Sequence, residues 1–305
     1  MTAPRFELTI GDHRVRAELL DDRAPRICQA LRADLPVDSF AVHAKFAGEE
    51  LIVMLPFVAA DENPATSVAP GDIGYYPSRQ TLCLFYGQIM PFASVTVFAR
   101  VLPDDLPSAR AAGQAVLRAG ALPARLTAAG PAGPAPGPAS GRPSPLLDRL
   151  GAATRAAWPA EPADVTRLRS YGRPPMGTMP CAVYANFDLF WAGENLQVCR
   201  ALAEEGRLSG PQVGLTTAAL LRRTASRLGK WGFADTVGLL EEVAADLESP
   251  SGAAAQATTL PAAIDGVQLY LDRVQSWLDA IIPWTAMDRS LRLLEPPAAQ
   301  QGGSA

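Results

Sequence analysis

The pattern of apolar and polar positions changes near residue 120, and the two sides predict different elements. Before it, short runs rich in Val, Ile and Phe alternate with Gly, Pro and Asp, as in "FELTI" and "HRVRAEL" around the turn "GDH". Runs of this kind predict β-strands joined by hairpins. Residues 24–36 instead predict a helix, because Ile27 and Leu31 fall on one helical face and Pro36 ends it.

Residues 39–56, "SFAVHAKFAGEELIVMLP", predict two more strands around a turn at Ala47-Gly48. Alternation along the first of them is expected to leave His43 and Lys45 together on the face opposite the apolar residues. With "TLCLFYG" and "SVTVFARV" added, residues 1–120 hold about six or seven strands and one or two helices. This content predicts a compact β-barrel or sandwich.

The stretch "GPAGPAPGPASGRPSP" consists almost wholly of Gly, Pro, Ala and Ser. Such a composition buries too little apolar surface to offset its ordering entropy, so we place a linker at residues 121–145. Beyond it the apolar spacing becomes helical, in the segments 144–158, 182–206, 213–232, 234–249 and 261–282. The sequence therefore predicts an α+β protein: a barrel, then an antiparallel helical bundle over 146–295 and a disordered tail over 296–305.

Composition narrows the classes of partner. A net charge of −4 disfavours nucleic-acid binding, and no apolar run approaches the length of a membrane span. The N-terminus lacks the apolar core of a signal peptide, and the four cysteines show no CxxC spacing. With only two histidines, a metal site is not expected. We expect a cytoplasmic protein with no nucleic-acid or membrane partner, and leftover apolar bundle faces are consistent with a homodimer.

Two clusters carry candidate chemistry, and the first is "GDIGYYPSR" at residues 71–79. One interpretation is a turn whose tyrosines cover the end of the barrel while Arg79 is solvated. In the other, Tyr75 and Tyr76 form a wall for a flat ligand and Arg79 binds a carboxylate through its planar fork. The His43 and Lys45 pair leaves the same choice open between solvent and a pocket.

The second cluster is "YGRPPMGTMPCAVYANFDLFWAGEN" at residues 171–195. Phe187, Trp191 and Glu194 lie at i, i+4 and i+7, hence on one helical face, with Asp188 on an adjacent stripe. The aromatic stripe is either bundle core or a ligand site. A carboxylate packed against aromatic rings tends to have a raised pKa, which suits a general acid or base. The sequence contains no GxGxxG after a strand, no P-loop, no GxSxG and no HExxH.

The segments "LPVDSFAVHAKFAGEELIVMLP" and "VAPGDIGYYPSRQTLCLFYG" resemble the small cyclophilin-like proteins of bacteria, over about residues 5–103. The shared motif is Gly-Asp-Ile, an aromatic pair, Pro, and a strand ending in an aromatic residue and Gly. The Phe-His-Arg stretch of prolyl isomerases is absent. A cyclophilin-like domain followed by a helical bundle is similar to the cucumopine/mikimopine synthases and the bacterial Pictet–Spenglerases, which form β-carbolines in alkaloid biosynthesis.

This resemblance implies a cofactor-independent enzyme of secondary metabolism. It would condense an aromatic amino acid, tryptophan-type or histidine, with an aldehyde or α-keto acid. Such a reaction needs a flat slot, a cation for a carboxylate and groups that move protons. The substrate-binding candidates are Tyr75, Tyr76, Arg79, Lys45, Tyr86, Phe187 and Trp191. The proton-transfer candidates are Glu194, Glu62, Asp188 and His43. The alternatives are a peptide-binding module or prolyl isomerase, and a noncatalytic scaffold in which both clusters are core.

Overall fold

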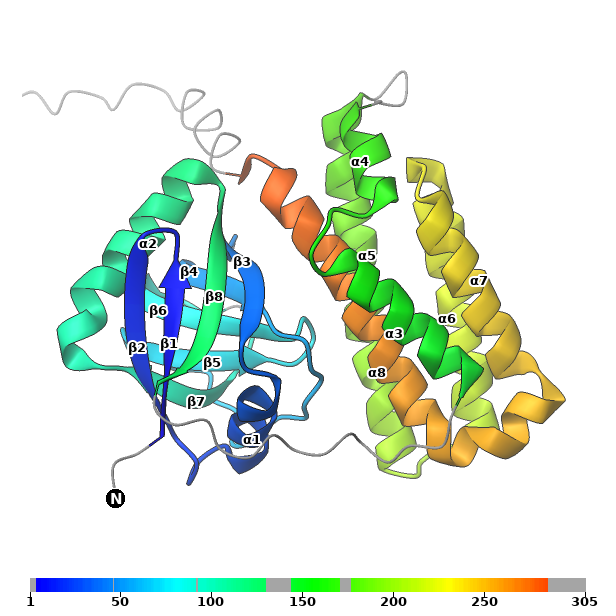
Figure 1. Cartoon of the computed structure of the whole chain (residues 1–305). Helices are drawn as coiled ribbons and strands as arrows, with labels where there is room; N and C mark the ends of the chain where they lie inside the picture. The colour runs from blue at the N-terminus through cyan, green and yellow to red at the C-terminus, as the bar shows by residue number, and fades with distance from the viewer. Residues whose placement is uncertain (1–3, 46, 92, 130–143, 171–176, 285–305) are drawn as a thin grey trace, which may run out of the picture.

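The computed structural model describes residues 4–45, 47–91, 93–129, 144–170 and 177–284. A β-barrel stands beside a helical bundle (Figure 1), so the predicted α+β fold is confirmed. The barrel is closed in the strand order β1-β2-β7-β5-β6-β4-β3-β8. Its strands are β1 (Arg5–Ile10), β2 (His13–Leu19), β3 (Val37–His43), β4 (Gly48–Met54), β5 (Asp72–Tyr76), β6 (Thr81–Ile89), β7 (Thr96–Val101) and β8 (Ala121–Ala129).

Strand β8 corrects the predicted domain boundary. It pairs antiparallel with both β1 and β3 and so closes the barrel, which means that the linker placed at 121–145 was wrong over residues 121–129. Ala124 and Leu126 point into the barrel core, while Pro123 and the remaining small residues carry little strand signal of their own. Residues 130–143 of the expected linker and the expected tail at 296–305 lie outside the described residues.

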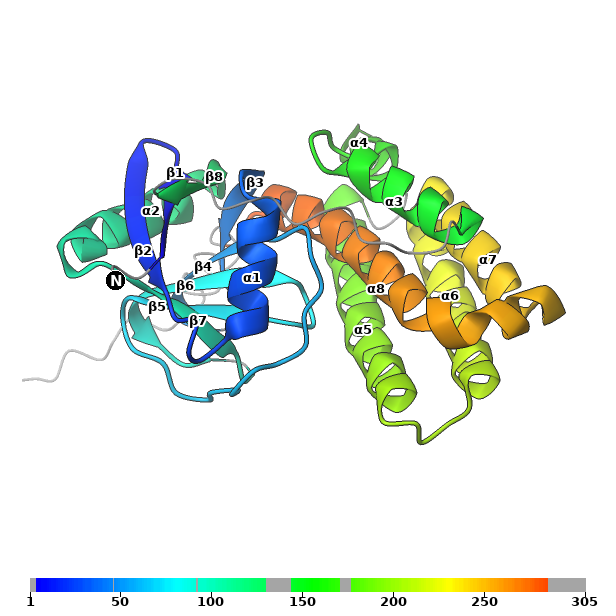
Figure 2. The same ribbon diagram turned by 60° about the horizontal axis from the view of Figure 1, so that its bottom comes forward.

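Two helices cover the barrel. The predicted helix at 24–36 is confirmed as α1 (Pro25–Asp34), which buries Ile27 and Leu31 in the barrel core. Helix α2 (Leu106–Ala119) follows a short 3-10 turn and packs along the barrel wall (Figure 2). Gly113 allows α2 to approach closely, because a side chain there would collide with the ring of Tyr86.

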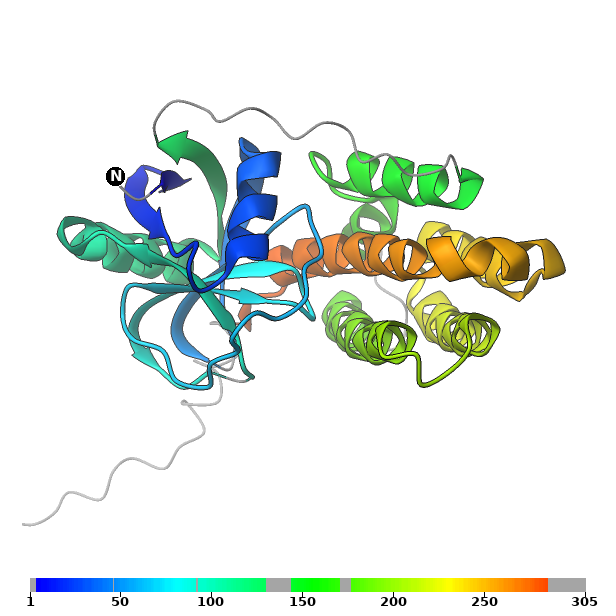
Figure 3. The same cartoon turned by 90° about the horizontal axis from the view of Figure 1, so that it is seen from below.

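The bundle holds more helix than the sequence predicted. Helix α4 was not expected, and α5 and α8 both begin earlier than predicted. Helix α8 packs against α3, α5, α6 and α7, and its C-terminal end reaches the barrel (Figure 3). No helix within the described ranges is long and apolar enough to cross a membrane. The helices are α3 (Pro145–Ala157), α4 (Ala163–Ser170), α5 (Thr178–Glu204), α6 (Gly210–Trp231), α7 (Ala234–Glu248) and α8 (Pro250–Ile281).

Arg273 on α8 docks the bundle onto the barrel. Its side chain is buried, with only 2% of the residue exposed, and its guanidinium lies 4.6 Å from the ring of Phe40 and 4.5 Å from that of Trp158. It donates to Ser39 Oγ at 3.2 Å and to the carbonyl of Trp158. Burial lowers the pKa of Arg273 to about 10. The cation–π contacts and hydrogen bonds compensate for that burial, so the two domains meet at a defined interface.

The turn between β5 and β6 forms a second contact between the domains. Gln197 of α5 and Gln268 of α8 donate to the carbonyl of Pro77 at 3.2 and 3.3 Å. A Cβ at Gly193 would lie 3.0 Å from the carbonyl oxygen of Ser78, so a glycine there lets the helix approach the turn. The turn that carries Arg79 is therefore held by the bundle.

Candidate active site

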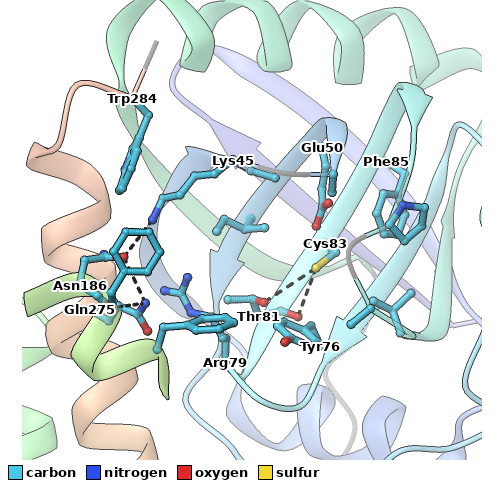
Figure 4. Close-up of a pocket in the computed structure, with 18 of the residues that line it drawn as sticks. Lys45, Glu50, Tyr76, Arg79, Thr81, Cys83, Phe85, Asn186, Gln275 and Trp284 are labelled. Atoms are coloured by element: carbon cyan, nitrogen blue, oxygen red, sulfur yellow. Dashed lines mark hydrogen bonds between the residues drawn. The ribbon is translucent and has the colours of Figure 1, made fainter. Parts of the chain in front are cut away.

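A cavity of about 350 Å³ lies between the outer face of the barrel and the bundle (Figure 4). Strand alternation along β6 explains its barrel wall, because successive side chains point to opposite faces. Leu82, Leu84 and Tyr86 point into the barrel core, whereas Thr81, Cys83 and Phe85 line the cavity. Cavities that hold small ligands have volumes of about 300–1,000 Å³, so this one can accept a small molecule.

Aromatic side chains from both domains line the cavity. Tyr76 and Phe85 belong to the barrel, and Phe187, Phe190 and Trp191 come from α5. Phe187 is 40% exposed and Trp191 60% exposed, so the α5 stripe was not bundle core and two of its rings remain open to solvent. The arrangement offers several ring faces and edges to a flat aromatic ligand.

Two cations share one carboxylate in the wall of the cavity. Asp279 of α8 accepts a hydrogen bond at 2.6 Å from Arg79 and is paired through its other oxygen with Lys45. Burial opposes its charge, but Lys45 and Arg79 together hold the pKa of Asp279 below its usual value. Asn186 of α5 also donates to Asp279, at 2.7 Å. Counted at neutral pH, this cluster carries one more positive than negative charge.

Glu50 places a carboxyl group in the cavity wall opposite the bundle. It begins the cavity-facing alternation of β4, with Ile52 two positions on, and lies beside the thiol of Cys83 (Figure 4). Only 5% of the residue is exposed, and burial raises the pKa of Glu50 to about 7. The group can therefore hold or release a proton at neutral pH.

Five of the predicted substrate-binding residues line the cavity together: Lys45, Tyr76, Arg79, Phe187 and Trp191. Glu194 lies behind this wall, where its Oε1 accepts a hydrogen bond at 2.8 Å from the hydroxyl of Tyr76. Glu194 can hold the ring of Tyr76 in place, but it does not itself line the cavity. Arg79 is buried against Asp279, so the interpretation in which it is solvated was wrong.

Tyr75, Tyr86 and His43 lie elsewhere, on the inner side of the barrel. Adjacent residues of a strand face opposite ways, so Tyr75 points into the barrel while Tyr76 lines the cavity. Tyr75 is fully buried and donates to the carbonyl of Phe57 at 3.2 Å. The hydroxyl of Tyr86 is hydrogen-bonded to Nε2 of His43 at 2.8 Å. Strand β3 ends at His43, so the expected alternation does not carry on to Lys45.

Two predicted carboxylates also lie away from the cavity and have partners of their own. Glu62 accepts a hydrogen bond at 2.9 Å from the backbone N–H of Ile27, at the first turn of α1. Asp188 accepts one at 2.7 Å from Nε1 of Trp231 and is paired with Arg227 within the bundle. Both contacts stabilise their own domain. Among the described residues, no group of three or more His, Cys, Asp or Glu side chains could hold a metal ion.

Sequence reasoning missed Glu50, Asp279 and the amide side chains of Asn186 and Gln275. Glu50 follows a turn-like "AGE", and whether its side chain faces the cavity depends on which face of β4 points outward. A signal was present, because Glu50 and Ile52 share one strand face and Leu51 and Val53 share the other. Asp279 is 200 residues from Arg79 in sequence, and no local pattern joins them.

A comparison with solved structures finds a match to almost the whole chain. The solved structure of McbB in complex with tryptophan superposes with a TM-score of 0.74 at 19% identity, covering 93% of this chain and 99% of that one. This chain has the fold of McbB. The likeness to McbB spans barrel and bundle together, so the predicted relationship is confirmed at the level of the fold.

The other comparisons are narrower than that with McbB. Residues 7–128 match a family model described as "Protein of unknown function (DUF3830)". The solution structure of the hypothetical protein AF2241 from Archaeoglobus fulgidus has 21% identity and a TM-score of 0.33, covering 42% of this chain and 95% of that one. No curated protein matches the sequence.

Proposed function

We propose that this protein is a Pictet–Spenglerase, which condenses an aromatic amino acid with an aldehyde or α-keto acid to a tetrahydro-β-carboline or related fused ring. The observation that carries the proposal is the cavity between the domains. It combines an aromatic lining, an excess of positive charge at Lys45 and Arg79, and a buried carboxyl group at Glu50. The fold shared with McbB, whose solved structure contains tryptophan, supports an amino acid of that type.

Binding would use both domains. Rings of Tyr76 and Phe85 on the barrel and of Phe187 and Trp191 on α5 offer faces to an indole or imidazole. The cluster around Asp279 keeps one uncompensated positive charge, which attracts a substrate carboxylate. Holding both reactants in one cavity replaces an encounter in solution by a step between neighbours.

The amine of the amino acid and the carbonyl compound condense, with the overall loss of one water, to an iminium ion. The electron-rich ring carbon then attacks the iminium carbon and closes the new ring. A base must finally remove the proton from that ring carbon to restore aromaticity. Glu50 fits this task, because a pKa of about 7 leaves roughly half of the group ionised at neutral pH. A positioned base of this kind contributes about 10²–10⁴-fold to the rate.

Incubation of the purified protein with tryptophan or histidine, each paired with 2-oxoglutarate or with simple aldehydes, tests the proposal. Mass spectrometry should find a product at the summed mass of one pair less one water, formed as a single stereoisomer. Glu50→Gln should abolish most of the product, and Glu49→Gln is the matched control, because Glu49 bonds to the backbone of Gln88 instead. If no pair gives enzyme-dependent product, the proposal is rejected for these substrate classes.

A further inference from the structure

Lysine is rare in this chain. Of its 27 basic Lys and Arg residues, just Lys45 and Lys230 are lysines. Lys230 lies exposed near the end of α6, whereas the side chain of Lys45 is 10% exposed and lines the cavity. Arginine serves as the cation almost everywhere else, including next to Lys45 at Arg79. An amine can lose its proton and act as a nucleophile, which a guanidinium cannot do in proteins.

The surroundings of Lys45 act on the charge of its amine in both directions. Its ammonium lies 4.2 Å from the ring centroid of Trp284 and 3.3 Å from Oδ1 of Asn186, and both contacts favour the charged form. A second cation, Arg79, binds the same carboxylate of Asp279. Apolar burial and a neighbouring cation both favour the neutral amine. Burial lowers the pKa of Lys45 to about 8 although Asp279 opposes it, so about a tenth of the amine is free at pH 7.

We propose that Lys45 forms a Schiff base with the carbonyl substrate, an aldehyde or α-keto acid, before the amino acid reacts. The inference rests on the proposed function for the identity of the carbonyl class. The neutral amine of Lys45 attacks the carbonyl carbon and gives a carbinolamine. Its hydroxyl group takes up a proton and leaves as water, so that a carbon–nitrogen double bond forms and the nitrogen carries a positive charge. No oxidant or reductant is involved.

Asp279 suits the product of this step as well as the free enzyme. The ammonium and the iminium ion both carry one positive charge at the same nitrogen, so the carboxylate has a cationic partner before and after the step. The amine of the amino acid then attacks the iminium carbon and displaces Lys45, which returns to its starting state. The new iminium ion belongs to the two substrates and is the species that the ring carbon attacks. Lys45 thus delivers an activated carbonyl carbon to the cavity.

Reductive trapping on the full-length protein tests the inference without any amino acid present. The protein is incubated with pyruvate, or separately with propanal, and sodium cyanoborohydride, which reduces an iminium ion to a stable amine. Peptide mass spectrometry should find the peptide with Lys45 heavier by the mass of the probe less one oxygen atom. Labelling of Lys45 should be at least about tenfold faster than that of Lys230, because burial lowers the pKa of Lys45 and so raises the fraction of its amine that is free.

Two variants sharpen the result. Lys45→Arg keeps a cation for Asp279 but cannot form an imine, so the adduct should vanish while Lys230 is labelled as before. Lys230→Arg should leave the Lys45 adduct unchanged. Labelling of Lys230 with none at Lys45, with both probes, overturns the inference. Product formation in the condensation assay together with that result would leave the proposed function standing. An adduct at Lys45 without any condensation product would instead support the inference and reject the proposed function.

Discussion

Replacing Glu50 by Gln removes a carboxyl group whose ionised form lowers the stability of the folded protein, because it is buried. Burial raises the pKa of Glu50 from 4.5 to about 7. Between these values the folded state binds more protons than the unfolded state, so the free energy of unfolding falls as the pH rises. At about 1.4 kcal/mol per pKa unit, ionised Glu50 costs the native protein about 3 kcal/mol above pH 7.

The Gln variant lacks this cost. Its advantage in free energy of unfolding should grow between pH 4.5 and pH 7 and should reach about 3 kcal/mol at pH 8. Urea denaturation followed by circular dichroism at pH 4.5 and pH 8 measures the difference. Turnover should fall over the same comparison by about 10²–10⁴-fold, because the variant has no base at this position. Glu49→Gln controls for the loss of one negative charge on the same strand.

A stability difference between Glu50→Gln and the wild-type protein that stays constant from pH 4.5 to pH 8 would contradict the raised pKa of Glu50. It would mean that Glu50 titrates at its ordinary pKa and is hydrated in the native protein. A variant that is more stable at high pH but turns over normally would keep the electrostatic account and remove Glu50 from the mechanism.

Three further variants probe the cavity and its surroundings. Asp279→Asn leaves the buried cations Lys45 and Arg79 without a counter-ion and should lower the free energy of unfolding by about 3–5 kcal/mol; an unchanged urea midpoint would contradict the charge cluster. Trp191→Ala should raise the KM for the aromatic amino acid roughly tenfold at an almost unchanged Tm, because the ring is 60% exposed; an unaltered KM would exclude it from the slot. Glu62→Gln should cost about 1 kcal/mol through weaker bonds to α1 and leave turnover intact, and a loss of turnover would return Glu62 to the mechanism.

Local patterns account for the parts of the fold that the sequence predicted. The hairpin of β1 and β2, and helix α1 with Ile27 and Leu31, each follow from spacing within a few residues. Strand β8 has no such signal, because four of its nine residues are Ala and Pro123 stands among the rest. Pairing with β1 and β3, about eighty or more residues away along the chain, makes it a strand.

The site was predictable where a residue's type and its face could both be read. Phe187 and Trp191 share a helical face, so if one of them lines the cavity the other is expected to line it too. Tyr75 and Tyr76 are adjacent on β5, and the sequence alone does not tell which of them faces outward. Asp279 becomes important only when α8 reaches the barrel, which is a property of the docked domains.

In the proposed function, the cavity between barrel and bundle holds the aromatic amino acid against Glu50. A crystal structure of the protein with tryptophan, without any carbonyl compound, tests it most directly. We expect the indole ring between the barrel wall and Trp191, with a ring carbon facing the carboxyl group of Glu50 and the amino-acid carboxylate near Lys45 and Arg79. Tryptophan bound at another place, with this cavity occupied by solvent alone, would contradict it.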